Sequence, residues 1–386
     1  MSIYLDHNAT TPLDERVLAA MLPYLREQHG NPSSGHQSGR LARAAIERAR
    51  EQVAVLVNAH PSQVVFTSGG TEANNLAIKG VAARLPAGRI AISAVEHSSV
   101  REPALALRRQ AWLVDEIAVD AQGQVDRESL HHVLTQRPAL LAMMLANNET
   151  GIVQDVAAIA AAARGVGSIV LTDAVQAAGK LALDFAASGA HLMSLSAHKI
   201  YGPKGIGALI VDKAVDMEPL LQGGGHEKGR RAGTENVAAI VGFGMAAELA
   251  RAELTSRREH LQTLHSYLES RLLSELPQVR IFGQSTKARQ AERLPNTSFL
   301  AAPGVDGATL LMSLDQAGLA VSSGSACSTG EVEPSHVLLA MGIDKKLARA
   351  AVRVSLGKDS RRSDIDAFVD CLKAQLRALQ GFGAVA

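Results

Sequence analysis

The stretch Ser194-Leu-Ser-Ala-His-Lys-Ile-Tyr-Gly-Pro-Lys-Gly205 presents one lysine, Lys199, directly after a short apolar run and among hydroxyl, imidazole and glycine neighbours. A lysine amine attacks an aldehyde readily only when burial or a neighbouring cation lowers its pKa, and His198 and Lys204 flank Lys199. This arrangement is typical of a lysine that forms a Schiff base. A solvated loop lysine is the alternative, so the interpretation depends on the rest of the chain.

A glycine-rich segment follows another apolar run. Val64-Val-Phe66 leads into Thr67-Ser-Gly-Gly-Thr-Glu-Ala-Asn-Asn75, which predicts a strand, a glycine loop and the start of a helix. Backbone N–H groups at a helix N-terminus bind anions, and Gly69 and Gly70 would let a phosphate approach closely while Thr71 donates a hydroxyl. The segment matches neither the dinucleotide fingerprint nor the P-loop, so a single phosphate fits it better. An ordinary capped helix is the alternative.

A carboxylate ends a third apolar run, Ser168-Ile-Val-Leu-Thr-Asp-Ala-Val-Gln176. An aspartate at the carboxyl end of a parallel strand, here Asp173, can pair with a protonated ring nitrogen and keep a pyridine electron-withdrawing. Gln176 would then reach a hydroxyl on the same ring. The alternative is that Asp173 only caps the segment that follows.

Two further runs end in side chains suited to an aromatic ligand. Leu141-Ala-Met-Met-Leu-Ala-Asn-Asn-Glu-Thr-Gly151 brings Asn148 to a position from which it would donate to a ring oxygen, although a simple turn also explains the segment. Ile90-Ala-Ile-Ser-Ala-Val-Glu-His97 places a histidine after a strand, where it would stack on a ring or move protons. A structural histidine is the alternative for His97.

All these side chains follow predicted strands, at the edge where open parallel sheets bind ligands. One phosphate site, one acid for a ring nitrogen and one Schiff-base lysine together describe pyridoxal phosphate. The sequence therefore predicts a pyridoxal 5'-phosphate enzyme.

The chain also resembles the cysteine desulfurases of the NifS/IscS type, a group within the class V aminotransferase family. The resemblance extends over nearly the whole chain, and its motifs occur in the family's order. They are Tyr4-Leu-Asp-His-Asn-Ala-Thr-Thr-Pro12, Gly30-Asn-Pro-Ser-Ser34, Thr67–Asn75, Glu96-His-Ser-Ser99, Ala146-Asn-Asn-Glu-Thr-Gly151, Ser196-Ala-His-Lys199, Arg230-Arg-Ala-Gly-Thr-Glu-Asn236 and Ser322-Ser-Gly-Ser-Ala-Cys327.

The resemblance implies an activity and a role for each candidate residue. L-cysteine would be converted to L-alanine, leaving a persulfide on Cys327 after its thiolate attacks the substrate sulfur. Lys199 would hold the cofactor and then move the Cα proton, while Asp173 would keep the pyridine nitrogen protonated. The other implied roles are phosphate binding by Gly70, Thr71, Ser196 and His198, with Thr234 reaching the phosphate across a homodimer interface; ring-hydroxyl contact by Asn148 and Gln176; ring stacking by His97; and carboxylate binding by Asn31 and Arg353.

The sequence also distinguishes Arg353 and the two cysteines from their neighbours. Arg353 lies within a strand pattern, where its guanidinium needs either a substrate carboxylate or a structural Asp or Glu as partner. Cys327 lies in a Ser/Gly-rich segment typical of a loop able to move, which favours a reactive thiol. Cys371 shares a helical apolar face with Phe368 and Leu372, so we expect it in the core.

Composition agrees with an ordinary cytoplasmic enzyme. The net charge of +1 over 386 residues gives no reason to expect nucleic acid or anionic lipid as a partner. The longest apolar run, 139–146, is far shorter than the ~20 residues of a membrane span, and the first residues contain no secretory signal pattern. Two cysteines form no disulfide framework.

The order of the elements predicts an α/β fold of the pyridoxal-phosphate fold type I, with two domains. We expect residues 15–258 to form a large domain around a mostly parallel sheet, and residues 1–14 with 259–386 to form a smaller α+β domain that carries the Cys327 loop. The strand at 205–211 follows its predecessor too closely for a helical crossover and should pair antiparallel. The seven predicted strands of the sheet are 64–66, 89–93, 112–117, 139–145, 169–173, 192–196 and 205–211.

Two alternatives stay open at this stage. Another reaction of the same fold, such as that of a selenocysteine lyase, an aminotransferase or a racemase, would make Cys327 dispensable. A binding function toward sulfur-acceptor proteins, such as an iron–sulfur scaffold protein, would make catalysis secondary. The chain ends at Ala386 without the longer tail that IscS-type members use to dock such a scaffold, which favours the NifS branch or a specialised pathway.

Overall fold

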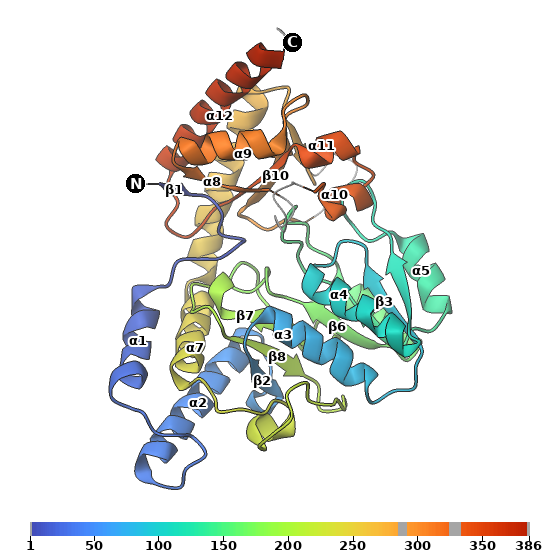
Figure 1. Ribbon diagram of the computed structural model, residues 1–386, viewed down its shortest axis with the longest axis vertical. Helices are drawn as coiled ribbons and strands as arrows, with labels where there is room; N and C mark the ends of the chain where they lie inside the picture. The colour runs from blue at the N-terminus through green and yellow to red at the C-terminus, as the bar shows by residue number, and fades with distance from the viewer. Residues whose placement is uncertain (1, 285–291, 324–332, 384–386) are drawn as a thin grey trace.

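The computed structural model describes residues 2–284, 292–323 and 333–383 (Figure 1). Within them, seven strands form one sheet in the order β2-β8-β7-β6-β5-β3-β4. The pairs from β7 to β4 are parallel, whereas β8 pairs antiparallel with both β2 and β7. The mostly parallel sheet and its antiparallel member are thus confirmed. The strands are β2 (Val64–Thr67), β3 (Arg89–Ser93), β4 (Leu113–Ile117), β5 (Leu140–Ala142), β6 (Ile169–Asp173), β7 (Leu192–Ser196) and β8 (Gly207–Val211).

Helices cover both faces of this sheet because its central strands are apolar on both sides. In β3, Ile90 and Ile92 pack into the core shared with α3 and α4, while Ala91 packs into the core shared with α2, α6 and α7. Figure 1 shows α3 and α4 on the near face of the sheet. The helices of this part are α1 (Glu15–Arg26), α2 (Gln37–Leu56), α3 (Gly70–Asn75), α4 (Ser98–Ala106), α5 (Arg127–Thr135), α6 (Val156–Gly165) and α7 (Val237–Ala252).

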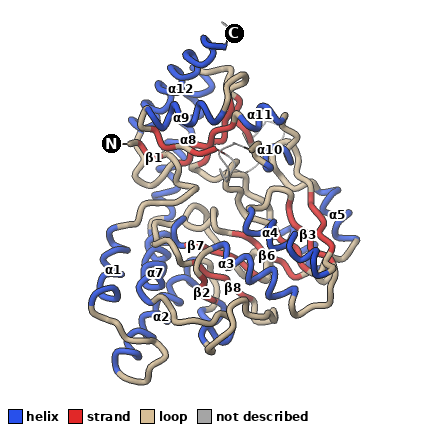
Figure 2. The backbone as a smooth tube through the Cα atoms, viewed as in Figure 1, coloured by secondary structure: helices blue, strands red, loops and turns tan. Residues whose placement is uncertain are grey.

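A second, antiparallel sheet, β12-β13-β10-β9, lies in the C-terminal part and has its own core. Its strands and helices appear above the large sheet in Figure 2. These elements are α8 (Leu254–Glu275), β9 (Arg280–Phe282), β10 (Thr297–Ala301), α9 (Gly307–Gln316), β11 (Leu319–Ala320), β12 (Ser322–Ser323), α10 (His336–Ala340), α11 (Lys345–Arg349), β13 (Ala351–Ser355) and α12 (Arg362–Gly383).

The N-terminal segment joins the C-terminal part. Strand β1 (Ile3–Tyr4) pairs parallel with β11, and Leu5 lies in the same core as α8 and α12. Residues 6–11 then pass between the two sheets, since the Asn8 N–H bonds to the Ser355 hydroxyl and the Thr11 N–H bonds to the His198 carbonyl. The boundaries of the two domains at residues 14 and 258 stay a prediction.

The structure differs from the sequence-based expectation in the lengths of several strands, most of all in β5, which covers only Leu140–Ala142 of the predicted 139–145, and in the division of one C-terminal strand. The pattern at 319–322 predicts a single strand, but β11 and β12 are two short strands with different partners. Leu319 and Ala320 pair with the N-terminal β1, whereas Ser322 and Ser323 pair with β13. A contact with a segment more than 300 residues away decides this division, so local sequence does not show it.

Candidate active site

A cavity of about 790 Å³ opens at the carboxyl ends of β6 and β7 and extends toward β13. This is the edge at which the sequence predicts a ligand site, because the carboxyl ends of parallel strands lie together there. The predicted residues in its wall are Gly70, Thr71, His97, Asn148, Asp173, Gln176, Ser196, His198, Lys199 and Arg353.

Asp173 is the last residue of β6 and is held firmly in place. Its side chain accepts hydrogen bonds from Asn74 Nδ2 at 2.7 Å and from the Val175 N–H at 2.9 Å, and the residue is only 7% exposed. Asn74 also donates to Ser99 Oγ at 2.9 Å. These bonds fix the carboxylate of Asp173 in the cavity wall, where it can stabilise a cationic ring nitrogen.

Lys199 ends the short 3₁₀ turn Ala197–Lys199 that follows β7. Its Nζ donates to the carbonyl oxygens of Asn8 and Ala9. Burial, assisted by the positive charge of Arg353, lowers the pKa of Lys199 to about 8. The flanking residues that the sequence suggested do not cause this shift. Desolvation and the neighbouring Lys199 lower the pKa of His198 to about 4, so His198 is neutral at physiological pH.

The predicted phosphate loop lies beside Lys199. Gly70 and Thr71 begin α3, and with Ser196 and His198 they also line an adjoining cavity of about 420 Å³. Gly207 on β8 allows the loop to pack this closely, because a Cβ there would lie 2.7 Å from the Gly69 backbone. The two hydroxyls and the N-terminus of α3 give this end of the cavity the donors that a phosphate needs.

His97 caps α4 and contributes its ring to the cavity wall. Its Nδ1 accepts the Ser99 N–H at 3.1 Å, so the neutral ring carries its proton on Nε2. Desolvation lowers the pKa of His97, and the nearby Lys199 and Arg353 act in the same direction against Asp173. The structure therefore presents a neutral imidazole, which suits stacking on an aromatic ring.

Arg353 lies on β13, across the cavity from the large sheet. Its Nη2 forms an ion pair with Asp6 at 2.7 Å and its Nη1 donates to the Asn148 carbonyl at 3.1 Å. Its Nε is buried and has no hydrogen-bond partner among the described residues. The structural acid that the sequence left open as a partner is therefore Asp6, and it leaves part of the guanidinium unpaired.

Two buried glutamates stand close to the cavity. Glu149 lines it, and burial raises the pKa of this residue to about 7 although the Ser335 hydroxyl donates to its carboxylate. Burial also raises the pKa of Glu96 to about 8, and the charge of Asp173 adds to the effect. Both acids therefore hold their protons more tightly than an ordinary glutamate.

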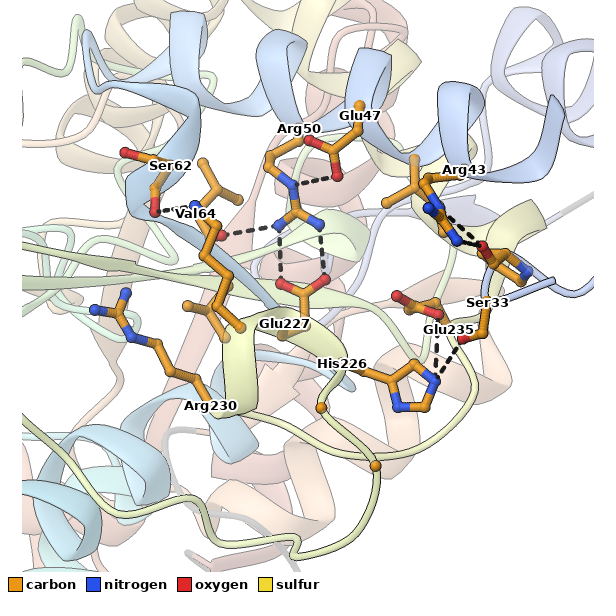
Figure 3. Close-up of a pocket in the computed structure, with 16 residues that line it drawn as sticks. Ser33, Arg43, Glu47, Arg50, Ser62, Val64, His226, Glu227, Arg230 and Glu235 are labelled. Atoms are coloured by element: carbon orange, nitrogen blue, oxygen red, sulfur yellow. Dashed lines mark hydrogen bonds and ion pairs between the residues drawn. The ribbon is translucent and has the colours of Figure 1, made fainter. Parts of the chain in front are cut away.

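Asn31 and Thr234 do not line the cavity that contains Lys199. Both are exposed. Their neighbours in the chain, Ser33 and Glu235, line a different cavity of about 530 Å³ between α2 and the loop at 223–236 (Figure 3). Ser33 Oγ and His226 Nε2 lie 3.1 Å apart and connect the two loops. The roles implied for Asn31 and Thr234 stay predictions.

A buried ion pair fixes the loop at 223–236. Arg50 Nη1 and Nη2 donate to the two carboxylate oxygens of Glu227 at 2.8 Å each, as Figure 3 shows. Glu227 also accepts the Phe66 N–H at 2.9 Å, while Glu227 and Lys228 adopt left-handed backbone angles with φ of 47° and 58°. The ion pair thus stabilises the unfavourable left-handed conformation at residues 227 and 228. Thr234, in the same loop, lies at the surface.

Of the two cysteines, only Cys371 lies within the described residues. Cys327 lies outside the described residues, so its predicted role is not tested. Cys371 on α12 is half-buried against the C-terminal core, and burial raises its pKa.

The sequence reasoning missed two residues that organise the site, Asn8 and Asn74. Asn8 is 1% exposed, lines the cavity and contacts Lys199 through its carbonyl. Asn74 holds Asp173. Both lie in motifs that carry the family resemblance, Tyr4–Pro12 and Thr67–Asn75, and an amide side chain within the motif is the signal that the sequence offers for each.

The fold and this site define a class of protein. The chain belongs to the aminotransferase class-V family, which matches residues 3–368. Its α/β architecture is that of the pyridoxal-phosphate fold type I: a solved NifS-like protein superimposes with a TM-score of 0.91 at 35% identity, covering 98% of this chain and 100% of that one.

Several relatives that are 40–44% identical over nearly the full chain are cysteine desulfurases. Cysteine desulfurase 2 of Trichormus variabilis is 43% identical over 384 residues, which is 98% of this chain and 95% of the relative. The structure of SspA in complex with cysteine matches with a TM-score of 0.78 at 31% identity, covering 92% of this chain and 99% of SspA.

Proposed function

We propose that this protein is a cysteine desulfurase that binds pyridoxal 5'-phosphate and converts L-cysteine to L-alanine. The observation that carries the proposal is that one cavity contains both the buried carboxylate of Asp173 and an amine, Lys199, with a strongly lowered pKa. Full-length relatives that are cysteine desulfurases support the same reaction.

The residues present fit the cofactor. Asp173 would pair with the ring nitrogen, Gln176 and Asn148 would contact the ring hydroxyl, and His97 would stack on the ring. Gly70, Thr71, Ser196 and His198 would hold the phosphate, because they supply donors at one end of the cavity. When bound, the cofactor would supply an electron sink for negative charge that develops at the substrate Cα.

Lys199 has the properties of both the anchoring amine and the proton carrier. Its lowered pKa leaves a substantial neutral fraction near neutral pH, and only the neutral amine can bind an aldehyde or accept a proton. Once released from the cofactor, Nζ would take the proton from the substrate Cα and return one to a carbon of the product.

The substrate would be oriented by its carboxylate. Arg353 faces the cavity, and its ion pair with Asp6 fixes the plane of the guanidinium. A bidentate contact to the carboxylate of L-cysteine would use the geometry that arginine favours. A second donor from Asn31 stays a prediction, because this residue does not line the cavity. The complex of the related SspA with cysteine supports L-cysteine as the substrate.

The sulfur would then pass to Cys327. The Cys327 thiolate attacks the substrate Sγ, an S–S bond forms and the Cβ–S bond breaks. The electron pair of the broken bond stays on Cβ, which takes a proton and becomes the methyl group of L-alanine. The enzyme is left with a persulfide, and a sulfur-acceptor protein, such as an iron–sulfur scaffold, would receive the terminal sulfur.

We also propose a homodimer in which Thr234 acts in the partner's site. This assignment is supported by the exposure of Thr234 and by the buried Arg50–Glu227 pair that holds its loop. The proposed setting is the cytoplasm. Among the described residues, none of the helices has the length and apolar character needed to cross a membrane.

The proposal is tested by trapping the cofactor on the protein. Borohydride reduction of the purified protein followed by peptide mapping should recover the cofactor on Lys199, and Lys199→Ala should neither trap it nor release alanine from L-cysteine. Recovery of the cofactor on Lys204 or another lysine would contradict the assignment.

A further inference from the structure

A second lysine lies buried beside Lys199 and has no part in the mechanism above. Lys180 is only 7% exposed, and with Lys199 it lines a narrow cavity of about 20 Å³. Burial, with the charges of Lys199 and Arg353, holds the pKa of Lys180 well below its usual value. Because a buried amine is costly unless its protons are bonded, its partners indicate its role.

Both hydrogen-bond partners of Lys180 among the described residues are neutral amide oxygens. Nζ donates to Gln176 Oε1 at 2.9 Å and to Asn8 Oδ1 at 3.1 Å. A lysine amine carries at least two protons whether or not it is charged, so these two bonds can be made in either state. Lys180 therefore links two amides without needing a counter-ion.

The backbone carbonyl of Asn8 connects this pair of amides to Lys199. Gln176 Nε2 donates to the Asn8 backbone oxygen at 2.9 Å, and Lys199 Nζ donates to that same oxygen. Lys180, Gln176 and Asn8 thus form a closed ring of hydrogen bonds. The Asn8 carbonyl in this ring is also an acceptor for Lys199 Nζ. Gln176 Nε2 carries a second proton, which remains for an acceptor in the cavity.

Asn8 is fixed from its other side by the C-terminal part of the chain. Its Nδ2 donates to Thr297 Oγ1 at 2.8 Å and to the Asn148 carbonyl at 3.1 Å. These acceptors determine which way the Asn8 amide faces, and its oxygen is left pointing to Lys180. Gln176 has no comparable support, because Lys180 is the one donor to its Oε1 among the described residues.

We propose that Lys180 is a positioning residue of the active site, which acts through Gln176 and Asn8 to aim the Gln176 amide at the cofactor and to hold the carbonyl that receives Lys199. This inference rests on the proposed function, because it takes Gln176 as a contact of the cofactor ring. Without Lys180, the Gln176 oxygen would be buried with no donor, and the amide would turn away to find one.

The test measures cofactor binding by the cofactor-free protein. Lys180→Met keeps an unbranched side chain one atom shorter than lysine and removes the amine donor, while Lys213→Met at an exposed site is the matched control. Pyridoxal 5'-phosphate affinity and the absorption maximum of the bound cofactor are recorded for both, and for Gln176→Leu and the Lys180→Met/Gln176→Leu double variant. Thermal unfolding confirms that each variant is folded.

We expect Lys180→Met to weaken cofactor binding about tenfold and to shift the absorption maximum, with no change in Lys213→Met. The loss in the double variant should be clearly smaller than the sum of the two single losses, because one of the two hydrogen bonds through which Lys180 acts goes to Gln176. Wild-type affinity in Lys180→Met, or additive losses in the double variant, would overturn the inference. If the wild-type protein itself binds no cofactor, the proposed function fails instead.

A measurement on the wild-type protein covers the case in which Lys180→Met does not fold. Reductive methylation of the cofactor-free protein, followed by peptide mass spectrometry, compares the two lysines directly. Lys199 should be modified while Lys180 stays protected, because Lys199 lines the large cavity whereas Lys180 is only 7% exposed and its Nζ is bonded to Gln176 and Asn8. Equal modification of both lysines in the folded protein would contradict the hydrogen-bond ring.

Discussion

Replacing Asp173 by alanine should remove most of the activity at a modest cost in stability. The structure gives the stability cost from two hydrogen bonds, those from Asn74 and from the Val175 N–H. Asn74 keeps its second bond to Ser99, so we expect a loss of about 1–3 kcal/mol in the free energy of unfolding.

The loss of catalytic rate should be larger than the loss of stability, because the carboxylate stabilises the positive charge on the ring nitrogen. A carboxylate about 4 Å from a cation stabilises it by about 4 kcal/mol at an effective dielectric constant of about 20. Loss of this stabilisation would lower the protonation of the ring nitrogen about 1,000-fold, and the electron sink would weaken accordingly. A residue that merely caps the chain would show the stability loss without the kinetic one.

The assay is the rate of alanine formation from L-cysteine at saturating cofactor, with urea unfolding measured on the same samples. Asn74→Ala is the matched variant, since it removes one support of Asp173 and keeps the carboxylate. It should lose far less activity than Asp173→Ala. Activity of Asp173→Ala within tenfold of wild type would refute the role given to this carboxylate.

Three further results are expected. Because burial lowers the pKa of Lys199 to about 8, the rate at which the cofactor-free protein binds pyridoxal 5'-phosphate should rise through about pH 8; a rise only near pH 10.5 would contradict the burial of this amine. In an equimolar mixture of Lys199→Ala and Thr234→Ala chains, half of the dimers are hybrids, and each hybrid has one intact site made from Lys199 of one chain and Thr234 of the other. The mixture should therefore regain about a quarter of wild-type activity. No gain on mixing would exclude a role of Thr234 across the interface. Arg50→Met should cost about 3–5 kcal/mol in urea unfolding because it leaves Glu227 buried and unpaired, and an effect as small as that of Arg43→Met at an exposed position would show that the ion pair is not stabilising.

The parts of the fold that were predictable are those in which local pattern and tertiary structure agree. Strands β6 and β7 have the bounds that their sequence pattern predicts, because an apolar run in a buried parallel strand ends where polar site residues begin. The division of residues 319–323 was not predictable, since the partner of β11 is at the N-terminus.

The same distinction applies to the site. Asp173 and Lys199 end apolar strands, so each carries a local signal of its position. Lys180 and Asn8 carry none, because their roles arise only when the N-terminal segment crosses between the two sheets and brings Asn8 to Gln176. The lowered pKa of Lys199 also has a tertiary cause, namely burial and Arg353 on the other sheet.

In the proposed reaction, sulfur from L-cysteine passes to Cys327. Incubation of the holoenzyme with L-cysteine, thiol blocking and peptide mass spectrometry should find one added sulfur atom, about 32 Da, on the peptide that contains Cys327. Cys327→Ser should carry no added sulfur and form no alanine, while Cys371→Ser should match wild type because its thiol is half-buried on α12. Alanine formation by Cys327→Ser at the wild-type rate, or added sulfur on Cys371, would contradict the account.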